Sequence, residues 1–275
     1  MTPDAATLPT GGPARAERSS EAGRLPAAGE PLVHTRELSK IYRVGDSRIA
    51  ALNRVNLTIE RGTFTAVVGT SGSGKSTLLN MLAGLERPTA GEIHVAGQPL
   101  HTYNESQLVT YRREQVGFIF QSFNLIPSLT AIENVALPLS FRGIPKAARE
   151  RQARAILVQL GLAKHLSHRP GQLSGGQQQR VGIARAMAVR PTLVFADEPT
   201  GNLDSRTAEA TLNLFRTVIR RFGQTWVMVT HDAHLASFAD TIVSIGDGRI
   251  TGITETEHHP RNQRTPECPD KKVDR

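Results

Sequence analysis

Cysteine is almost absent from this 275-residue sequence, which contains a single one, Cys268. One cysteine cannot form a disulfide within the chain, so a disulfide-stabilised fold is excluded and a reducing cytoplasm is the natural compartment. Long apolar runs are also missing, because no stretch approaches the roughly 18 residues that suggest a membrane-spanning helix. If the protein works at a membrane, we therefore expect a partner to hold it there.

Acidic residues are fewer than basic ones: 25 Asp and Glu stand against 33 Lys and Arg, a formal net charge of +8. Such an excess suits nucleic acid, an anionic membrane face or a polyphosphate ligand, and does not choose among them. The basic residues are spread along the chain, with only short pairs such as Arg112-Arg113 and Arg220-Arg221. We therefore expect no direct binding of nucleic acid.

Large apolar residues are scarce at both ends of the chain. Residues 1–30 are rich in Ala, Pro, Gly, Ser and Thr, and residues 253–275 are polar and contain several prolines. Such segments cannot bury enough surface to offset the entropy lost on ordering. We expect both ends to be disordered, and one folded domain over residues 31–252.

Within that domain, short apolar runs alternate with amphipathic segments. The expected strands are Leu32–Tyr42, Ala50–Ile59, Phe64–Val68, Glu92–Val95, Val116–Phe120, Leu193–Ala196, Trp226–Thr230 and Thr241–Ile245. The expected helices are Leu78–Leu82, Lys146–Leu160, Gln177–Ala188 and Ala208–Arg221. This alternation predicts an α/β fold with a mostly parallel core sheet. The block from roughly Ile126 to Ala188 carries almost no strand signal, so we expect a helical insertion there, as a subdomain over about 122–190.

The strongest local motif directly follows the expected strand Phe64–Val68. It reads Gly69-Thr70-Ser71-Gly72-Ser73-Gly74-Lys75-Ser76, followed by Thr77, and it opens a helix, as a P-loop does. Its glycines let backbone N–H groups surround a phosphate, Lys75 would reach the β- and γ-phosphates, and Ser76 would bind Mg²⁺. A Gly/Ser-rich turn matching this pattern by chance arises in on the order of one chain in a hundred, and the strand–helix context lowers that further.

Two carboxylates end a second apolar strand, in Leu193-Val194-Phe195-Ala196-Asp197-Glu198. Asp197 at the strand tip suits Mg²⁺, and Glu198 could accept a proton from the attacking water. Taken alone, a solvated acidic turn before Pro199 is the commoner explanation. Together with a P-loop, the pair favours nucleotide hydrolysis.

A third motif, Leu173-Ser174-Gly175-Gly176-Gln177, places a Ser-Gly-Gly turn at the start of a helix. This gives the chain a second helix N-terminus that could bind an anion. The alternative is an ordinary serine N-cap with flexible glycines. Two phosphate-type sites far apart in one sequence suggest that two copies of the chain share one nucleotide.

In the order of these motifs the chain resembles the ATPases of ABC transporters, from about Leu32 to Ile250. The resemblance implies the P-loop NTPase fold of that family. That fold has a mostly parallel core sheet, an antiparallel β subdomain at its edge, and a helical subdomain, here at about 122–190, that carries the signature motif Leu173–Gln177. It also implies ATP and Mg²⁺ as cofactors.

The resemblance assigns roles to single residues that would be weak evidence alone. Gln121 matches the glutamine loop, which bridges Mg²⁺ and the membrane partner, and His231 matches the switch histidine at the γ-phosphate. Asp204 matches a loop that crosses the dimer interface, and Tyr42 sits where the family stacks an aromatic ring on adenine.

The resemblance thus implies three catalytic residues: Lys75, Glu198 and His231. The residues implied to bind ATP are Tyr42, Gly69, Thr70, Ser71, Gly72, Ser73, Gly74, Lys75, Ser76, Thr77 and Gln121. Those implied to reach the partner's ATP are Ser174, Gly175, Gly176, Gln177 and Asp204. Those implied to bind Mg²⁺ are Ser76, Gln121 and Asp197.

Two segments, Gln121–Thr130 and Pro199–Asp204, are similar to the ATPases of macrolide exporters, lipoprotein-release systems and the cell-division ABC complex. No transmembrane segment follows Ile250, so we expect the permease to be a separate chain that contacts Phe123–Asn134. The expected assembly is a homodimer at the cytoplasmic face of the cell membrane. A non-transporting signalling complex, or a soluble ATPase acting on nucleic acid, is the alternative.

Overall fold

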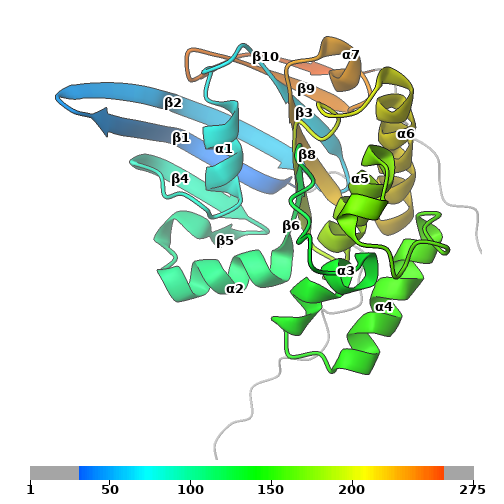
Figure 1. Cartoon of the computed structure of the whole chain (residues 1–275). Helices are drawn as coiled ribbons and strands as arrows, with labels where there is room; N and C mark the ends of the chain where they lie inside the picture. The colour runs from blue at the N-terminus through cyan, green and yellow to red at the C-terminus, as the bar shows by residue number, and fades with distance from the viewer. Residues whose placement is uncertain (1–30, 257–275) are drawn as a thin grey trace, which may run out of the picture.

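Two β-sheets and a set of helices make up the computed structural model, which describes residues 31–256 (Figure 1). The first sheet has the order β2-β1-β4-β5 and the second β10-β9-β3-β8-β7-β6. The strands are β1 (Pro31–Val44), β2 (Ser47–Glu60), β3 (Phe64–Val68), β4 (Ala90–Val95), β5 (Gln98–Pro99), β6 (Val116–Phe120), β7 (Leu193–Asp197), β8 (Thr225–Thr230), β9 (Thr241–Gly246) and β10 (Arg249–Glu255). The α-helices are α1 (Lys75–Leu82), α2 (Glu105–Gln115), α3 (Ala131–Ser140), α4 (Lys146–Gln159), α5 (Gly175–Met187), α6 (Ser205–Phe222) and α7 (Ala233–Ala236).

The second sheet is parallel except at its edge strand. β3 pairs in parallel with β8 and β9, β7 pairs in parallel with β8 and β6, and only β10 runs antiparallel, against β9. Parallel strands end at the same edge of a sheet, so the loops that follow β3, β6, β7 and β8 emerge together. The expected mostly parallel core and antiparallel edge sheet are therefore confirmed.

Two hydrophobic cores lie on the two faces of this parallel sheet. Along β8, Trp226 and Met228 face one core and Val227 and Val229 the other, which is the alternation a buried strand requires. The first core joins the sheet to α3, α4, α5 and α6, and the second joins it to α1 and the antiparallel sheet. Both faces of the parallel sheet, which includes the strand β3 before the P-loop, are thus covered by other elements (Figure 1).

A helical part occupies the stretch between β6 and β7. α3, α4 and α5 pack against one another there, and α5 also packs on β6 and α6. Helices and no strand lie between β6 and β7, the stretch in which the sequence predicts a helical insertion over about 122–190. None of the helices in the described range 31–256 is long and apolar enough to cross a membrane.

Some elements differ from the sequence expectation. α2 was not expected, although Asn104 and Gln107 form a capping box at its start. β10 was also not expected, and it continues to Glu255, past the domain end expected at residue 252. The expected disordered ends, residues 1–30 and most of 253–275, lie outside the described residues.

Asn134, at the start of α3, is a fully buried polar residue that holds the preceding loop. Its Oδ1 accepts a hydrogen bond from Ile126 N at 2.8 Å, and its Nδ2 lies 3.1–3.2 Å from the carbonyl oxygens of Ile126, Leu129 and Thr130. A buried side chain with all its polar atoms satisfied fixes one loop conformation. The loop from Ile126 to Thr130 therefore depends on this one amide.

Asn134→Ala leaves these backbone groups without their partner, so we expect the free energy of unfolding to fall by about 2–3 kcal/mol. Urea titration followed by tryptophan fluorescence measures this, because Trp226 is the one tryptophan of the chain and is fully buried. Asn213→Ala on the exposed surface of α6 is the control and should stay within about 0.5 kcal/mol. Equal stability of the two variants would contradict this account of the loop.

Candidate functional site

The P-loop links β3 to α1, and its lysine lies inside it. Lys75 is only 8% exposed, and its Nζ donates hydrogen bonds to the carbonyl oxygens of Gly69 at 2.9 Å and Thr70 at 2.7 Å. The N-cap residue Gly74 offers no side chain, and the first turn of α1 has no acidic residue. The helix N-terminus is therefore open to an anion beside a buried ammonium group.

Gly74 has a conformation and surroundings that only glycine fits. Its φ is 103°, and a Cβ there would lie 2.3 Å from the carbonyl oxygen of Ala51 in β2. Gly248 supports the loop from its other side by donating its N–H to the carbonyl oxygen of Ser73 at 3.0 Å. The antiparallel sheet and the β9–β10 turn thus both fix the shape of the P-loop.

The two carboxylates at the end of β7 lie in the same region as Lys75. Burial raises the pKa of Asp197, the neighbouring Glu198 raises it further, and Lys75 opposes this shift. Glu198 has a φ of 44°, unusual for a residue other than glycine, and its N–H donates to the carbonyl oxygen of Val229 at 2.9 Å. A backbone strained in this way is typical of functional sites.

The predicted catalytic pair is in direct contact. His231 Nδ1 lies 2.7 Å from Glu198 Oε1, although the two residues follow different strands, β8 and β7. The histidine side chain is 69% exposed and the glutamate 24%, so the pair faces solvent at the mouth of the site. A cavity of about 390 Å³ adjoins the pair and includes Gln121 and Gly201 in its walls.

Gln121 and the loop after β7 are packed closely together. Asn202 Nδ2 donates to the carbonyl oxygen of Gln121 at 3.1 Å. A Cβ at Gly201 would come within 2.6 Å of Gln121 Nε2, so a larger residue there would displace the glutamine side chain. The Gly-Asn pair before Leu203 thus has a packing reason that the sequence alone did not reveal.

Tyr42 lies beside α1 and is held by a residue that the sequence analysis missed. Its hydroxyl donates to Glu86 Oε2, and Asn80 of α1 donates to Glu86 Oε1 at 3.0 Å. Lys40 Nζ lies 5.2 Å from the Tyr42 ring centroid and 3.4 Å from Glu86 Oε2. Burial and the Glu86 hydrogen bond raise the pKa of Tyr42. No local pattern points to Glu86, because its contact spans 44 residues.

The signature motif lies at the start of α5. Ser174 is the N-cap: its Oγ accepts from Gln177 N at 3.3 Å, while Gln177 Oε1 accepts from Ser174 N at 2.9 Å. Ser174, Gly175, Gly176 and Gln177 line neither of the cavities that adjoin His231. Within one chain, the structure does not bring the signature motif to the P-loop site.

Asp204, in contrast, lies near the signature motif. It is the N-cap of α6, and its Oδ1 accepts from Thr207 N at 3.0 Å. A Cβ on Gly176 would come within 2.7 Å of the Thr207 side chain, so this glycine permits α5 and α6 to approach closely. The residues expected to reach a partner's nucleotide thus form one group, apart from the P-loop.

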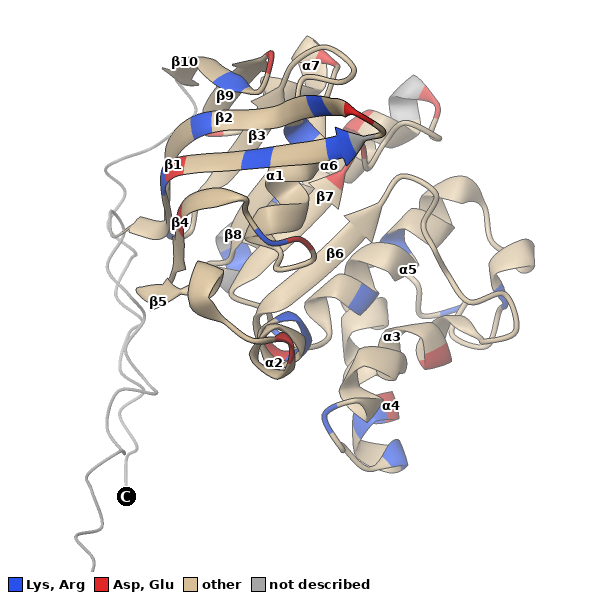
Figure 2. Cartoon of the chain, turned by 90° about the vertical axis from the view of Figure 1, so that its left-hand side faces the viewer, with Lys and Arg blue, Asp and Glu red and all other residues tan. Residues whose placement is uncertain are grey.

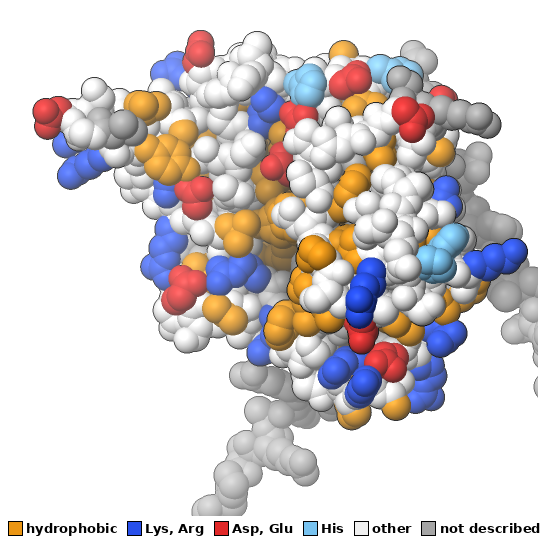
Figure 3. All heavy atoms as spheres, viewed as in Figure 1, with side chains coloured by type: hydrophobic (Ala, Val, Ile, Leu, Met, Phe, Trp, Pro, Cys, Tyr) orange, Lys and Arg blue, Asp and Glu red, His pale blue; other side chains and the backbone are white. Residues whose placement is uncertain are grey.

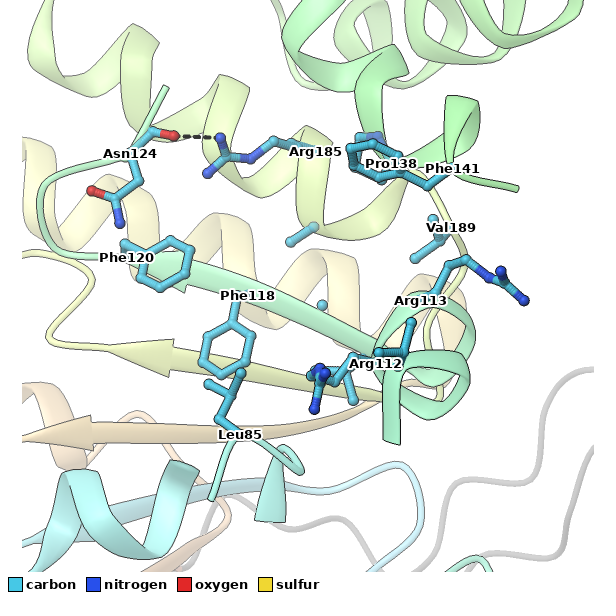
Figure 4. A pocket seen from close by; sticks show the side chains of 14 residues that line it. Leu85, Arg112, Arg113, Phe118, Phe120, Asn124, Pro138, Phe141, Arg185 and Val189 are labelled. Atoms are coloured by element: carbon cyan, nitrogen blue, oxygen red, sulfur yellow. Dashed lines mark hydrogen bonds between the residues drawn. The ribbon is translucent and has the colours of Figure 1, made fainter. Parts of the chain in front are cut away.

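A separate groove of about 610 Å³ is lined by α2 and β6 on one side and by α3 and α5 of the helical part on the other (Figure 4). Its walls are mainly apolar and include Leu85, Phe118, Phe120 and Phe141, with Phe141 65% exposed. Figure 3 shows hydrophobic side chains gathered on this face, whereas Figure 2 shows Lys and Arg scattered over the described part of the chain. An exposed apolar patch in a hollow indicates an interaction surface.

Arg185 of α5 forms part of the groove and holds the loop after Gln121. Its guanidinium donates to the carbonyl oxygens of Phe123, at 2.9 Å, and Asn124 (Figure 4). Phe123 and Asn124 both have positive φ, 59° and 47°. The helix that begins with the signature motif therefore also fixes the conformation of the loop that follows Gln121.

Protein ligands alone do not form a metal centre in the described range. No group of three or more His, Cys, Asp or Glu side chains between residues 31 and 256 could hold a metal ion.

A search for known protein families matches residues 52–201 to the ABC transporter family. An uncharacterized ABC transporter ATP-binding protein of Thermotoga maritima is 47% identical over 214 residues, which cover 78% of this chain and 91% of the relative. The macrolide export ATP-binding/permease protein MacB of Vibrio parahaemolyticus is 42% identical over 86% of this chain, but only 36% of that longer protein is covered.

A solved structure with the same fold is the dimeric post-hydrolysis state of the ATP-binding cassette MJ0796 bound to ADP and Pi. Its TM-score is 0.75 at 41% sequence identity, and the match covers 82% of this chain and all of that one. The P-loop, the carboxylate pair, the family match and this similarity agree. The chain therefore belongs to the ABC transporter family as one of its ATP-binding proteins, and it is an ATPase.

Proposed function

We propose that two copies of this chain close head-to-tail around two ATP molecules and drive a separate permease of the export or lipoprotein-release type. One observation carries the proposal: each chain has a P-loop site and a signature motif that lines neither cavity beside His231. A signature motif placed in this way would meet a nucleotide held in the P-loop of a second copy. The dimeric cassette bound to ADP and Pi and the macrolide export relative support this proposal.

ATP would bind with its phosphates in the P-loop. The Lys75 ammonium now bonds to carbonyl oxygens of Gly69 and Thr70, and it would exchange these for phosphate oxygens. Residues 69–77 would provide the remaining donors to the phosphates, and Tyr42 a surface for the adenine. Ser76, Asp197 and Gln121 would hold Mg²⁺, which neutralises phosphate charge when bound.

Glu198 would act as the base that orients the attacking water and accepts its proton. His231 shares a hydrogen bond with Glu198 through Nδ1, so its Nε2 stays available to the γ-phosphate. The strained backbone of Glu198 and its bond to Val229 keep the carboxylate at the strand tip. Ser174, Gly175, Gly176, Gln177 and Asp204 of the second copy would complete the site from the other side.

The groove in Figure 4 would receive a short segment of the permease. The expected contact over Phe123–Asn134 contributes Asn124 to this groove. The other lining residues belong to α2, β6, α3 and α5, or to the loops beside them at Leu85, Phe141 and Val189. Because Arg185 bonds the loop after Gln121 to α5, movement of the helical part would reach both the groove and the signature motif. Such a link would let nucleotide-driven closure act on the permease, at the cytoplasmic face of the membrane.

Glu198→Gln keeps the shape of the side chain but removes the base. We expect ATP to bind normally, turnover to fall by about 10²–10⁴-fold, and a stable dimer to accumulate with ATP and Mg²⁺. Phosphate release measures the turnover, and analytical ultracentrifugation measures the dimer and the nucleotide bound to it. Glu92→Gln, a carboxylate of β4 remote from the motifs, is the control. Wild-type turnover in Glu198→Gln would disprove the role of Glu198.

Asp197→Asn should raise the stability of the nucleotide-free protein while it removes the ATPase activity. Because burial and Glu198 raise the pKa of Asp197, the ionised carboxylate is less favourable in the folded than in the unfolded state at neutral pH. We expect the nucleotide-free variant to melt at a higher temperature than wild type near pH 7. The gain should shrink as the pH falls through the raised pKa of folded Asp197 and vanish below the ordinary Asp range, where the carboxyl is protonated in both states. Mg²⁺-dependent ATPase activity should be lost.

Phe141→Asp introduces a charge into the apolar groove. We expect a membrane protein that co-elutes stoichiometrically with Glu198→Gln, from detergent-solubilised membranes with ATP and Mg²⁺, to be lost when Phe141→Asp is added. ATP hydrolysis by the isolated Phe141→Asp chain should not change. Val158→Asp alters a similarly exposed apolar residue on α4, outside the groove, and is the control. Equal recovery with both variants would remove the groove from the permease contact.

A further inference from the structure

His165, in the loop between α4 and α5, contacts Gln177 of the signature motif. Its Nε2 lies 3.2 Å from Gln177 Nε2, a contact that joins the loop to the first turn of α5. The ring of His165 packs edge-on against His168, with centroids 4.9 Å apart. Neither histidine was singled out by the sequence motifs, and neither lines the cavities beside His231.

The hydrogen-bond network determines which atoms donate in this contact. Ser174 N–H can only donate, so the amide atom of Gln177 that faces it must be the oxygen, as the 2.9 Å bond has it. The other amide atom, Gln177 Nε2, therefore donates to His165 Nε2. In this contact the ring nitrogen therefore accepts, which is the tautomer with the ring proton on Nδ1.

The cost of this arrangement suggests that it has a role. His165 Nδ1 is buried and has no hydrogen-bond partner among the described residues. A buried N–H without an acceptor is unfavourable. The reverse tautomer would place its N–H against the Gln177 amide N–H at 3.2 Å, and two donors facing each other are less favourable than one unpaired N–H. The tautomer is thus fixed by Gln177 and, through it, by the N-cap at Ser174.

We propose that His165 is a positioning residue for dimer closure: it holds the Gln177 amide so that Ser174 and the start of α5 face the partner's nucleotide. The inference rests on the proposed head-to-tail dimer. Gln177 Oε1 accepts from Ser174 N, and Ser174 Oγ accepts from Gln177 N, so rotation of the Gln177 amide releases one of the two bonds that fix the cap. His165 supplies the third contact that prevents this rotation.

The same loop is bonded to the helix beside the proposed permease groove. Ala131 N donates to the carbonyl oxygen of His168 at 2.8 Å, and Ile132 N donates to that of Leu166 at 3.1 Å. Ala131 and Ile132 open α3, which contributes Pro138 to the groove. A shift of α3 would therefore move the His165 loop and, with it, the support of Gln177.

The test measures the ATP-dependent dimer dissociation constant in the Glu198→Gln background by analytical ultracentrifugation. His165→Phe keeps a ring but removes the acceptor, and we expect dimerisation to weaken about tenfold or more, because the contact occurs twice in a dimer. His165→Gln can place its Oε1 where Nε2 was, so it should restore most of the affinity. His168→Phe keeps the ring packing without touching Gln177 and should leave dimerisation unchanged.

Two further measurements exclude a general loss of structure. Binding of a fluorescent ATP analogue to the monomer should be the same in all variants, because the P-loop is intact. Adding His165→Phe to Gln177→Ala should weaken the dimer no further, since the group that His165 holds is already absent. Unchanged dimerisation of His165→Phe, or no rescue by His165→Gln, would overturn this inference alone. A Glu198→Gln parent that fails to dimerise with ATP would overturn the proposed function as well.

Discussion

The parallel pairing of β3, β8, β7 and β6 is the constraint on which the rest of the site depends. In this register Val68 lies opposite Thr230, and Asp197 lies opposite both Val229 and Phe120. Because the four strands end level, the P-loop, Gln121, the carboxylate pair and His231 emerge at one edge, although they are spread over more than half of the chain. A shift of one residue in the pairing of β7 with β8 would turn the side chains of one strand to the opposite face and separate Glu198 from His231.

The electrostatics of this edge favour a nucleotide. Lys75 is buried and its ammonium group bonds to backbone carbonyl oxygens. Asp197 adjoins Glu198 at a strand tip, where burial and the charge of Glu198 raise the pKa of Asp197. Phosphates would satisfy the ammonium and the open N-terminus of α1, and a divalent cation would relieve the repulsion between the carboxylates. Binding of ATP with its metal would therefore remove the unfavourable electrostatic interactions at this edge of the nucleotide-free protein.

The sequence predicted best what depends on local pattern. β3 and β6 have the expected bounds, because each is a short apolar run followed by the break that ends it. α2 was missed because only Leu108 and Tyr111 of this polar helix are buried, which leaves little apolar periodicity. Its capping box at Asn104 was the signal that could have predicted it. The contact of Glu86 with Tyr42, the support of Gln177 by His165 and most of the groove could not be predicted. They join segments that only the tertiary structure brings together.

The central claim is that each nucleotide lies between two chains. In the Glu198→Gln background, Lys75→Ala should fail to bind ATP, and Ser174→Arg should bind ATP but stay monomeric, since Ser174 is exposed and lies apart from the P-loop. The most direct measurement mixes these two variants with ATP and Mg²⁺ and determines mass and nucleotide content together. The account predicts heterodimers that hold one ATP, between the intact P-loop of one chain and the intact signature motif of the other. Dimerisation of Ser174→Arg alone with the affinity of its parent would contradict it.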